Sequence, residues 1–359
     1  MALISILTTE EKKRFETPPV FSSQERKRYF RFPSEVIKIA EELRTPTTKV
    51  CFLTTYGYFK ATNKFFNKQF LLTDLEFVAR NQNISESSIK LSEYQTRVYH
   101  EHKAKILELL GATKFDQTGR TLIEKEIFVM VRSQLRPKHI LQQIVDILLR
   151  NKIEIPSYFT LVESISKSML LYKKELGEII EKQLTPENKL LLDTLLEKEE
   201  KESEDDKLKR YRLTLLKKFY QSTRPMKVKA NTEDLATLSN LFHRLENVIT
   251  AINLSDEGIR YYSQFVLQSR TNQMLQKSEQ DKYLYIIAFI IHQYYKLQDG
   301  LLDTLIQVVQ HAVNKAREQE KTVYFEKREE DQLQKKQLLQ TNDLLRSKLT
   351  EYQMKSNLS

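Results

Sequence analysis

Cysteine and tryptophan are nearly missing from this sequence of 359 residues, which contains one cysteine, Cys51, and no tryptophan. A single thiol cannot close an intramolecular disulfide or supply a zinc cluster, so neither kind of cross-link is expected. The first residues also lack the basic start of a signal peptide. The densest apolar run, residues 284–291, is far short of the roughly 20 residues that span a bilayer. These absences favour a cytoplasmic protein without a membrane partner.

Glycine and proline are scarce as well, with six and eight residues respectively. Both residues interrupt regular secondary structure, whereas the abundant Leu, Ile, Lys, Glu and Gln favour helices. The sequence therefore predicts an all-α fold. The aromatic residues between positions 46 and 66 recur at helical spacing, which favours a buried core over a platform for stacking bases.

The motifs of common catalytic sites are absent from the sequence. It has no Gly-rich phosphate loop, no Gly-x-Ser-x-Gly nucleophile turn and no zinc signature. His100 and His102 are two positions apart on an expected helix and point to different sides, so they cannot hold one metal together. Carboxylates are plentiful, but without a shared pocket they cannot act as acid, base or metal ligands. We predict no catalytic residue, no cofactor, no metal and no small-molecule ligand.

Positive charge is in excess, with a net charge of +10 and a sequence pI of about 9.3. Such an excess favours a polyanionic partner where it clusters. One cluster follows Ser22 and interleaves with Tyr29, Phe30 and Phe32. The expected phosphate contacts are Arg26, Lys27, Arg28 and Arg31. A solvated face on a small bundle explains the same pattern equally well.

A second basic group lies on the stretch of residues 94–110, which we expect to be helical and to end at Gly111. The residues Val98, His102, Ile106, Leu109 and Leu110 recur at helical spacing and define the face that we expect to be buried. The residues Arg97, His100 and Lys103 lie on its flank, where phosphate could reach them.

Residues 121–135 and 137–150 are expected to form two helices joined at Arg136-Pro137, with Arg132, Arg136, Lys138 and His139 near the turn. This arrangement fits a helix-turn-helix, but no feature of the sequence separates it from an ordinary helical hairpin.

The sharpest change of charge comes at residue 207. Residues 197–206 hold seven acids and two lysines, and residues 207–229 hold nine basic residues and no acid. An uninterrupted basic tract predicts an exposed segment that binds phosphate, with Lys209, Arg210, Arg212, Lys217, Lys218, Arg224 and Lys227 as contacts. Pairing with the preceding acids is the alternative.

The order of several motifs resembles the N-terminal region of the Tn-three family of transposases, which move replicative bacterial transposons. The residues that carry this resemblance are Tyr94, Arg97, Glu101, His102, Ile106, Gly111 and Phe115. The sequence departs from the family at Val98, Tyr99 and His100, where Thr, Arg and Arg are usual. Looser matches follow at Leu149-Arg150, Pro156, Thr160-Leu161 and Lys282-Tyr283, so the resemblance extends over about residues 1 to 315.

The resemblance implies that the chain binds double-stranded DNA at transposon terminal inverted repeats and contributes to a homodimer. In the family, three carboxylates of a ribonuclease-H-like domain bind the divalent metals, and that domain lies beyond the part that this chain matches. We therefore expect no cleavage of DNA by this chain. The alternative is a helical scaffold or regulator, for example a truncated transposase acting as a competitor.

Four parts are expected along the chain. Residues 1–155 would form an N-terminal DNA-binding domain and residues 156–230 a second helical segment with the acidic and then basic linker. Residues 231–317 would form a helical bundle suited to dimerisation, with Thr232 capping one helix and Gly300 separating two others. Residues 318–359 would form a charged helical or disordered tail.

Overall fold

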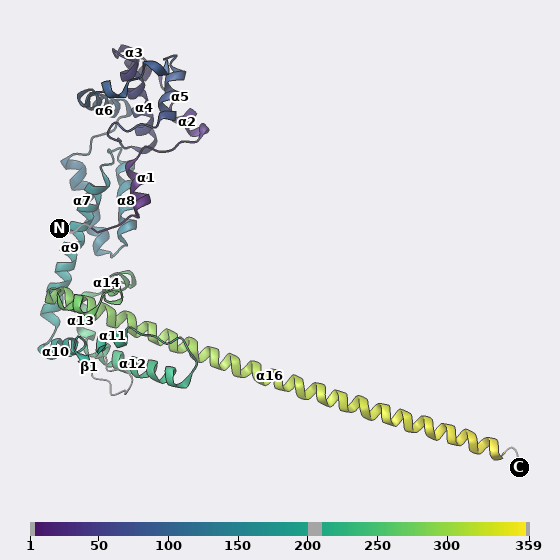
Figure 1. Ribbon diagram of the computed structural model, residues 1–359. Coiled ribbons are helices and arrows are strands. Elements are labelled where there is room, and N and C mark those ends of the chain that lie inside the picture. Colours follow the sequence, from purple (N-terminus) through teal and green to yellow (C-terminus); the bar gives the residue numbers. More distant parts are fainter. Residues whose placement is uncertain (1–3, 200–209, 357–359) are drawn as a thin grey trace. The chain divides into compact units, whose positions relative to one another are not determined.

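The computed structural model describes residues 4–199 and 210–356, and its elements are almost entirely α-helices (Figure 1). The predicted all-α fold is confirmed. The exceptions in the described part are the two-residue antiparallel strands β1 (Lys198–Glu199) and β2 (Arg210–Tyr211) and one isolated bridge between Thr113 and Ile153. The chain divides into two compact units: unit 1 comprises Met1–Leu192 and Leu245–Phe289, and unit 2 comprises Asp193–Arg244 and Ile290–Ser359.

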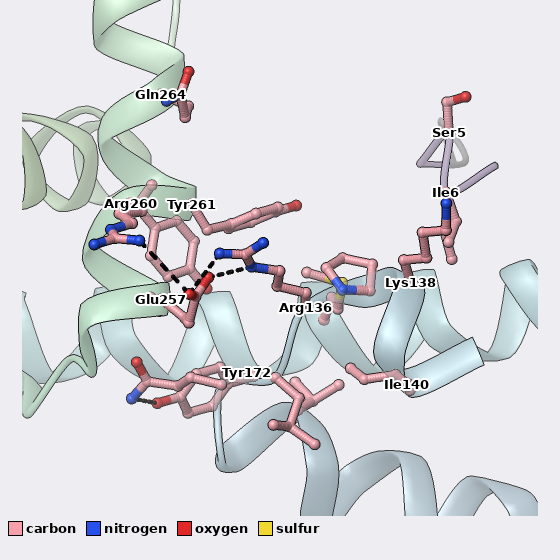
Figure 2. Close-up of a pocket in the computed structure, with 17 residues that line it drawn as sticks. Ser5, Ile6, Arg136, Lys138, Ile140, Tyr172, Glu257, Arg260, Tyr261 and Gln264 are labelled. Atoms are coloured by element: carbon pink, nitrogen blue, oxygen red, sulfur yellow. Dashed lines mark hydrogen bonds and ion pairs between the residues drawn. The ribbon is translucent and has the colours of Figure 1, made fainter. Parts of the chain in front are cut away.

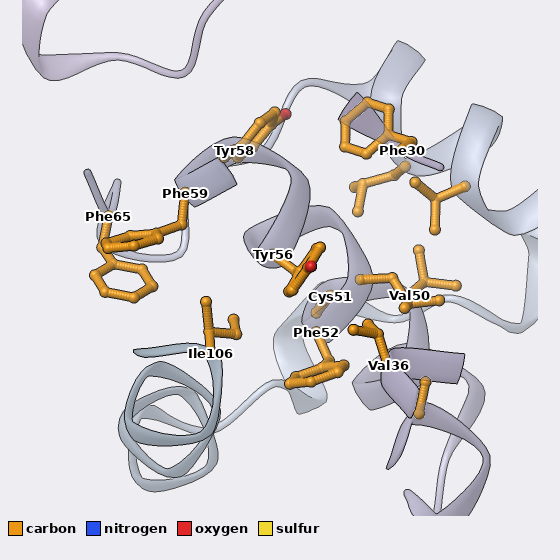
Figure 3. Packing of buried hydrophobic residues seen from close by; sticks show 14 of the residues in the cluster. Phe30, Val36, Val50, Cys51, Phe52, Tyr56, Tyr58, Phe59, Phe65 and Ile106 are labelled. Carbon is orange, nitrogen blue, oxygen red and sulfur yellow. The ribbon is translucent and has the colours of Figure 1, made fainter. Parts of the chain in front are cut away.

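The first helices of unit 1 include one apolar helix that four of the others surround. They are α1 (Thr9–Glu16), α2 (Ser23–Tyr29), α3 (Ser34–Glu42), α4 (Pro46–Thr62), α5 (Leu72–Asn81) and α6 (Thr96–Leu110), with the short 3-10 turns η1 (Glu86–Ser88) and η2 (Leu91–Glu93) before α6. Every residue of α4 from Val50 to Phe59 is buried, because α2, α3, α5 and α6 all pack against this helix. The core is rich in aromatic rings, including Phe52, Tyr58, Phe59 and Phe65 (Figure 3). The prediction that this aromatic segment is core is confirmed.

Helix ends in this region follow the expected chemistry. Thr8 and Ser22 begin α1 and α2, and each accepts a hydrogen bond from the backbone N–H three residues on. The glutamate at that third position bonds back to the cap, which completes a capping box. Gly111 ends α6 with a φ of 58°, a left-handed conformation that glycine adopts without strain.

The second layer of unit 1 is built on α7 (Gln117–Arg132), α8 (Pro137–Arg150) and α9 (Tyr158–Gln183). Their shared core holds Ile123, Ile127, Ile140, Ile144 and Leu161, all 0% exposed. Helix α7 begins four residues before the predicted start, because the Asp116 side chain accepts hydrogen bonds from the N–H groups of Thr118 and Gly119. The later helices α13 (Glu246–Ile252), α14 (Asp256–Gln268) and α15 (Thr271–Leu275) complete the unit, with α13 packed on α9.

The far half of α9 is held by the first turn of α16 (Glu279–Ser356). The Lys173 ammonium lies 2.9 Å from the Asp281 carboxylate, and the Gln280 amide donates to Glu181 at 2.9 Å. Gly177 leaves room for the Gln280 side chain, whose Cβ would lie 2.9 Å from an added Cβ. These contacts all belong to unit 1.

Unit 2 contains the end of α10 (Pro186–Thr194), the strand pair, α11 (Arg212–Leu216), α12 (Pro225–Arg244) and most of α16. Helix α12 begins at Pro225, so the prediction that Thr232 caps a helix is wrong. The backbone N–H of Val228 already donates to the Arg224 carbonyl, which starts the helix before Thr232. The predicted break at Gly300 is wrong as well, because α16 continues through it. The absence of a side chain at Gly300 lets the Phe219 ring pack against the α16 backbone, because an added Cβ there would overlap the ring.

Candidate nucleic-acid interface

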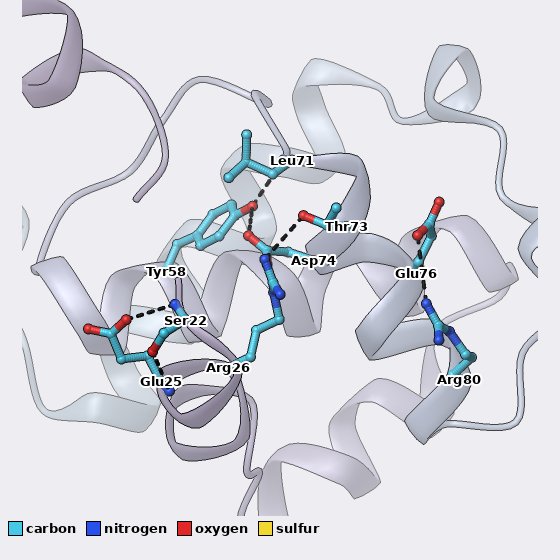
Figure 4. A network of polar contacts seen from close by, with 9 residues as sticks. All are labelled: Ser22, Glu25, Arg26, Tyr58, Leu71, Thr73, Asp74, Glu76 and Arg80. Atoms are coloured by element: carbon cyan, nitrogen blue, oxygen red, sulfur yellow. Dashed lines mark hydrogen bonds and ion pairs between the residues drawn. The ribbon is translucent and has the colours of Figure 1, made fainter. Parts of the chain in front are cut away.

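The Arg26 guanidinium belongs to a polar network with Asp74 and Tyr58 in unit 1 (Figure 4). Its Nε donates to the Asp74 carboxylate at 2.6 Å, and that carboxylate is 0% exposed. The other oxygen of Asp74 accepts from the Tyr58 hydroxyl at 2.9 Å, and Tyr58 accepts from the Leu71 N–H at 3.0 Å. Burial raises the pKa of Tyr58, so its hydroxyl stays a donor. Because Arg26 compensates a buried charge, it joins α2 to α4 and α5.

Three other cations gather beside this network without a carboxylate, and we name Arg28, Arg31 and Lys60 the cation cluster. The Lys60 ammonium, in the last turn of α4, donates to the Arg31 carbonyl at 3.3 Å. Arg28 lies over the Tyr29 ring, 5.6 Å from its centroid. Within residues 4–199 and 210–356, no ion pair joins any of the three to an acid.

Packing in the core brings these three side chains together. Phe30 is 3% exposed and lies against Gly57, where any side chain would overlap the ring. The absence of a Cβ at Gly57 therefore lets the segment of residues 28–31 approach the end of α4. The rings of Phe21, Phe77 and Tyr58 surround Phe30 at centroid distances of 5.6 to 6.1 Å and fix its position.

The electrostatics of the cation cluster favour an anionic ligand. Partial burial and the charges of Arg28 and Arg31 lower the pKa of Lys60. All three side chains are nonetheless exposed enough for a phosphate to reach them. A phosphate would relieve the repulsion that the cluster bears in the free protein. Lys27 is exposed on the same helix and adds to the local positive charge. The sequence analysis missed Lys60, whose only signal is a lone cation at the end of an apolar helix.

Helix α6 separates structural residues from exposed ones. His102 is 5% exposed, as predicted, and its Nδ1 lies 2.8 Å from the Tyr94 hydroxyl. Burial lowers the pKa of His102 to about 4, so the ring is neutral near pH 7. Ile106 of the predicted face is buried as well, whereas Val98, Leu109 and Leu110 are half-buried, and Tyr99 and Leu107 are buried without having been predicted.

The three flank residues of α6 differ from one another. Arg97 is 88% exposed and pairs with Glu101 one turn on, and His100 is exposed too. The prediction that Lys103 is open to phosphate is wrong. Its ammonium lies 2.8 Å from Glu154 and 4.5 Å from the Phe65 centroid, and its side chain is only 18% exposed.

The basic residues at the turn between α7 and α8 are each paired with an acid from elsewhere in unit 1. Arg132 lies 2.7 Å from Glu175 and Lys138 lies 2.6 Å from Glu11. Arg136 binds Glu257 through two N–H groups, at 2.5 and 2.6 Å. Lys138 and the Thr8 cap together lower the pKa of Glu11 to about 2. These pairs leave the turn with less free charge than its sequence suggests.

A pocket of about 460 Å³ opens beside this turn (Figure 2). Figure 2 shows the Arg136 guanidinium facing the Glu257 carboxylate, with Arg260 on the far side of that carboxylate. The remaining lining is mainly aromatic and aliphatic, and it includes Tyr172 and Tyr261. The lining carries cations and rings but no nucleophile activated by a neighbouring base.

The structure describes the basic tract of unit 2 from Arg210 onward. Lys209 lies outside the described residues, and of Arg210 only the backbone is described, which pairs with Glu199 across the two strands. Arg212 begins α11, whose Leu213 and Leu216 are buried, so this part is packed rather than an open linker.

Further along the tract, exposure increases. Lys217 and Lys218 are half-buried, and burial lowers the pKa of Lys217. Arg224 and Lys227 are exposed, and the Lys227 ammonium lies 4.0 Å from the centroid of the Tyr220 ring. Tyr220 is fixed by Asn231, whose amide both accepts from its N–H and donates to its carbonyl.

The described residues contain neither a group of three His, Cys, Asp or Glu side chains suited to a metal nor a helix long and apolar enough to cross a membrane. A family described as a domain of unknown function, DUF4158, matches residues 6–168. That region includes the cation cluster and the α7–α8 turn. No curated protein matches the chain.

Proposed function

We propose that this chain binds double-stranded DNA as the N-terminal part of a transposase of the Tn-three kind, with terminal inverted repeats as its target. The observation that carries the proposal is the cation cluster of Arg28, Arg31 and Lys60. It is exposed, close to Tyr29 and not neutralised by any acid of the described residues. The resemblance of the motifs around Arg97 and His102 supports the identity of the DNA target.

The proposed contacts to DNA are of two kinds, to backbone phosphates and to bases. The cation cluster and Lys27 would bind backbone phosphates, which fixes position but does not select a sequence. Helix α8 would supply the base contacts, because its first turn exposes His139. Arg224 and Lys227 in unit 2 would add further phosphate contacts.

The chain binds DNA in this proposal and leaves it uncut, because the carboxylates that perform strand transfer belong to a domain that it does not match. Incubation of an inverted-repeat duplex with the purified protein and Mg²⁺ or Mn²⁺ checks this. Nicking that follows the protein through every purification step would contradict it.

The decisive experiment is a binding titration with labelled duplex between roughly 50 and 200 mM salt. The variant Arg28→Ala/Arg31→Ala/Lys60→Ala should bind more weakly, and its salt slope should fall by up to about 0.9 for each lost phosphate contact. The matched control is Arg80→Ala/Lys90→Ala/Lys105→Ala. It removes the same charge from unit 1, but each of its cations is already paired with a glutamate. Equal losses in both variants would show that net charge, and not the cluster, determines binding.

A helical scaffold for protein partners is the second candidate. The long exposed part of α16, which bears many apolar side chains, favours it. In that case affinity for duplex would be weak, and the partner would bind with little dependence on salt.

A further inference from the structure

The part of α16 within unit 2 exposes a row of apolar side chains. Every residue described from Leu305 to Glu351 is exposed. At 100° per residue, ten large apolar residues fall within about 60° of one line along the helix. We name this row the α16 stripe: Leu302, Leu305, Ile306, Val309, Val313, Val323, Tyr324, Leu338, Leu345 and Leu349. Their exposed fractions range from 44% at Val313 to 70% at Leu338.

The spacing of the α16 stripe keeps it on one side over a long distance. Leu302 and Leu338 are 36 residues apart, which is ten turns at 3.6 residues per turn. The distance from Leu302 to Leu345 is about 65 Å at 1.5 Å per residue. Apolar residues that recur on one side of a helix over this length, exposed to water, mark an interaction site.

Charged residues interrupt the stripe over residues 317–335, with Arg317 and Lys335 at its edge. Glu320 and Lys327 lie on the same line, seven residues apart, and Asp331 follows. Within the described part of the chain, neither Glu320 nor Lys327 takes part in an ion pair. Two copies packed in parallel and in register would place each of these charges against its own copy, which is unfavourable.

We propose that two copies of this chain pack their α16 stripes against each other in antiparallel orientation, with the two-fold axis between Val323 and Tyr324. In that register each residue of one copy lies opposite the partner residue whose number, added to its own, gives 647. Leu302 then faces the partner's Leu345, and Val309 faces the partner's Leu338. The two-fold axis repeats both of these apolar pairs, whereas Leu305, Ile306 and Val313 face the partner's Asn342, Thr341 and Gln334 at the edge of the contact.

The same register also pairs the opposite charges. Glu320 faces the partner's Lys327, and the two-fold axis repeats this contact, so two ion pairs form. Asp331 faces the partner's Ala316, whose small side chain leaves the carboxylate in contact with water. The antiparallel register therefore pairs Leu302 with Leu345, Val309 with Leu338 and Val323 with Tyr324, and it also pairs the opposite charges of Glu320 and Lys327. The proposal concerns a surface distinct from the cation cluster and does not depend on DNA binding.

Disulfide cross-linking of the full chain tests the orientation. Cys51 is buried, so introduced cysteines are the reactive ones. The variant Leu302→Cys/Leu345→Cys should form a covalent dimer under mild oxidation, whereas Leu302→Cys and Leu345→Cys alone should not. Efficient cross-linking of each single variant would indicate parallel packing and overturn the proposal.

Sedimentation across a concentration series tests the charge pairs. Glu320→Lys and Lys327→Glu should each weaken dimerisation about tenfold or more, because each replaces two attractive pairs by two repulsive ones. The double variant Glu320→Lys/Lys327→Glu should restore it. The control Glu318→Lys changes a charge on the opposite side of the helix and should leave dimerisation unchanged. A monomer at every concentration, or failure of the double variant to restore the dimer, would overturn the proposal.

Discussion

Gly57→Ala is the substitution that separates packing from helix propensity most clearly. An alanine in the middle of a helix normally stabilises it, by up to about 1 kcal/mol relative to glycine. At Gly57, however, the added methyl group would overlap the Phe30 ring. Phe30 is 3% exposed and enclosed by other rings, so it cannot swing into solvent.

Overpacking of this kind costs about 1–3 kcal/mol. After the gain in propensity is subtracted, Gly57→Ala should destabilise unit 1 by up to about 2 kcal/mol, which lowers its melting temperature by up to roughly 8 °C. The displaced Phe30 should also separate Arg28 and Arg31 from Lys60, so DNA binding should weaken in the same variant.

Thermal melts of a double-mutant cycle provide the assay. Phe30→Ala alone should cost about 3–5 kcal/mol, because it empties a buried site. In that background Gly57→Ala should change sign and become neutral or stabilising, which gives a coupling energy of about 1–3 kcal/mol. Gly119→Ala serves as a control, since its Cβ would lie 3.2 Å from Phe115 and a small shift accommodates it. A stabilising effect of Gly57→Ala in the wild-type background would refute the reasoning.

Three further predictions concern polar groups of unit 1. Arg26→Ala should cost about 3–5 kcal/mol in denaturant unfolding because it leaves the Asp74 carboxylate buried and uncompensated, whereas Lys27→Ala should stay within about 0.5 kcal/mol. His102→Gln should remove a pH dependence of stability. The pKa of His102 is near 4 in the folded chain and 6.5 as its ordinary value, so its contribution is full above pH 6.5 and is lost as pH falls towards 4. An unchanged pH profile of the melting temperature would contradict that. Lys103→Ala should lower the melting temperature and leave the salt slope of DNA binding unchanged; a normal melt with a reduced slope would place Lys103 at the DNA.

The local part of this structure could be predicted from the sequence. Gly111 ends its helix as predicted, and Thr8 and Ser22 begin theirs by the same local rule, because a cap depends on residues within one turn. His102 is buried as its spacing indicated. The prediction from Thr232 was wrong because helix α12 already begins at Pro225. A residue that often caps helices can also lie inside one.

Whether each basic side chain is exposed or paired with an acid could not be predicted from the sequence. Arg26 and Arg28 lie on the same short helix, yet one is bound to a buried acid 48 residues away and the other is exposed. Arg136 binds Glu257, which is 121 residues distant. A cluster of basic residues in a sequence therefore does not by itself predict a phosphate-binding surface, because the acids that neutralise it come from remote helices. Lys60 is the opposite case. It is a single lysine in an apolar helix, and it belongs to the cation cluster because the segment that carries Arg28 and Arg31 packs beside it.

The length of α9 has a consequence for how unit 1 melts and how it can be divided. Its first half supplies Tyr158 and Leu161 to the core with α7 and α8, and its second half carries the bonds to the start of α16. A continuous helix shared by two clusters joins them into one cooperative folding unit. The DUF4158 match ends at residue 168, in the middle of this helix. A fragment cut there would lose Leu176 and Ile180, so the smallest piece expected to fold independently extends beyond Gln183.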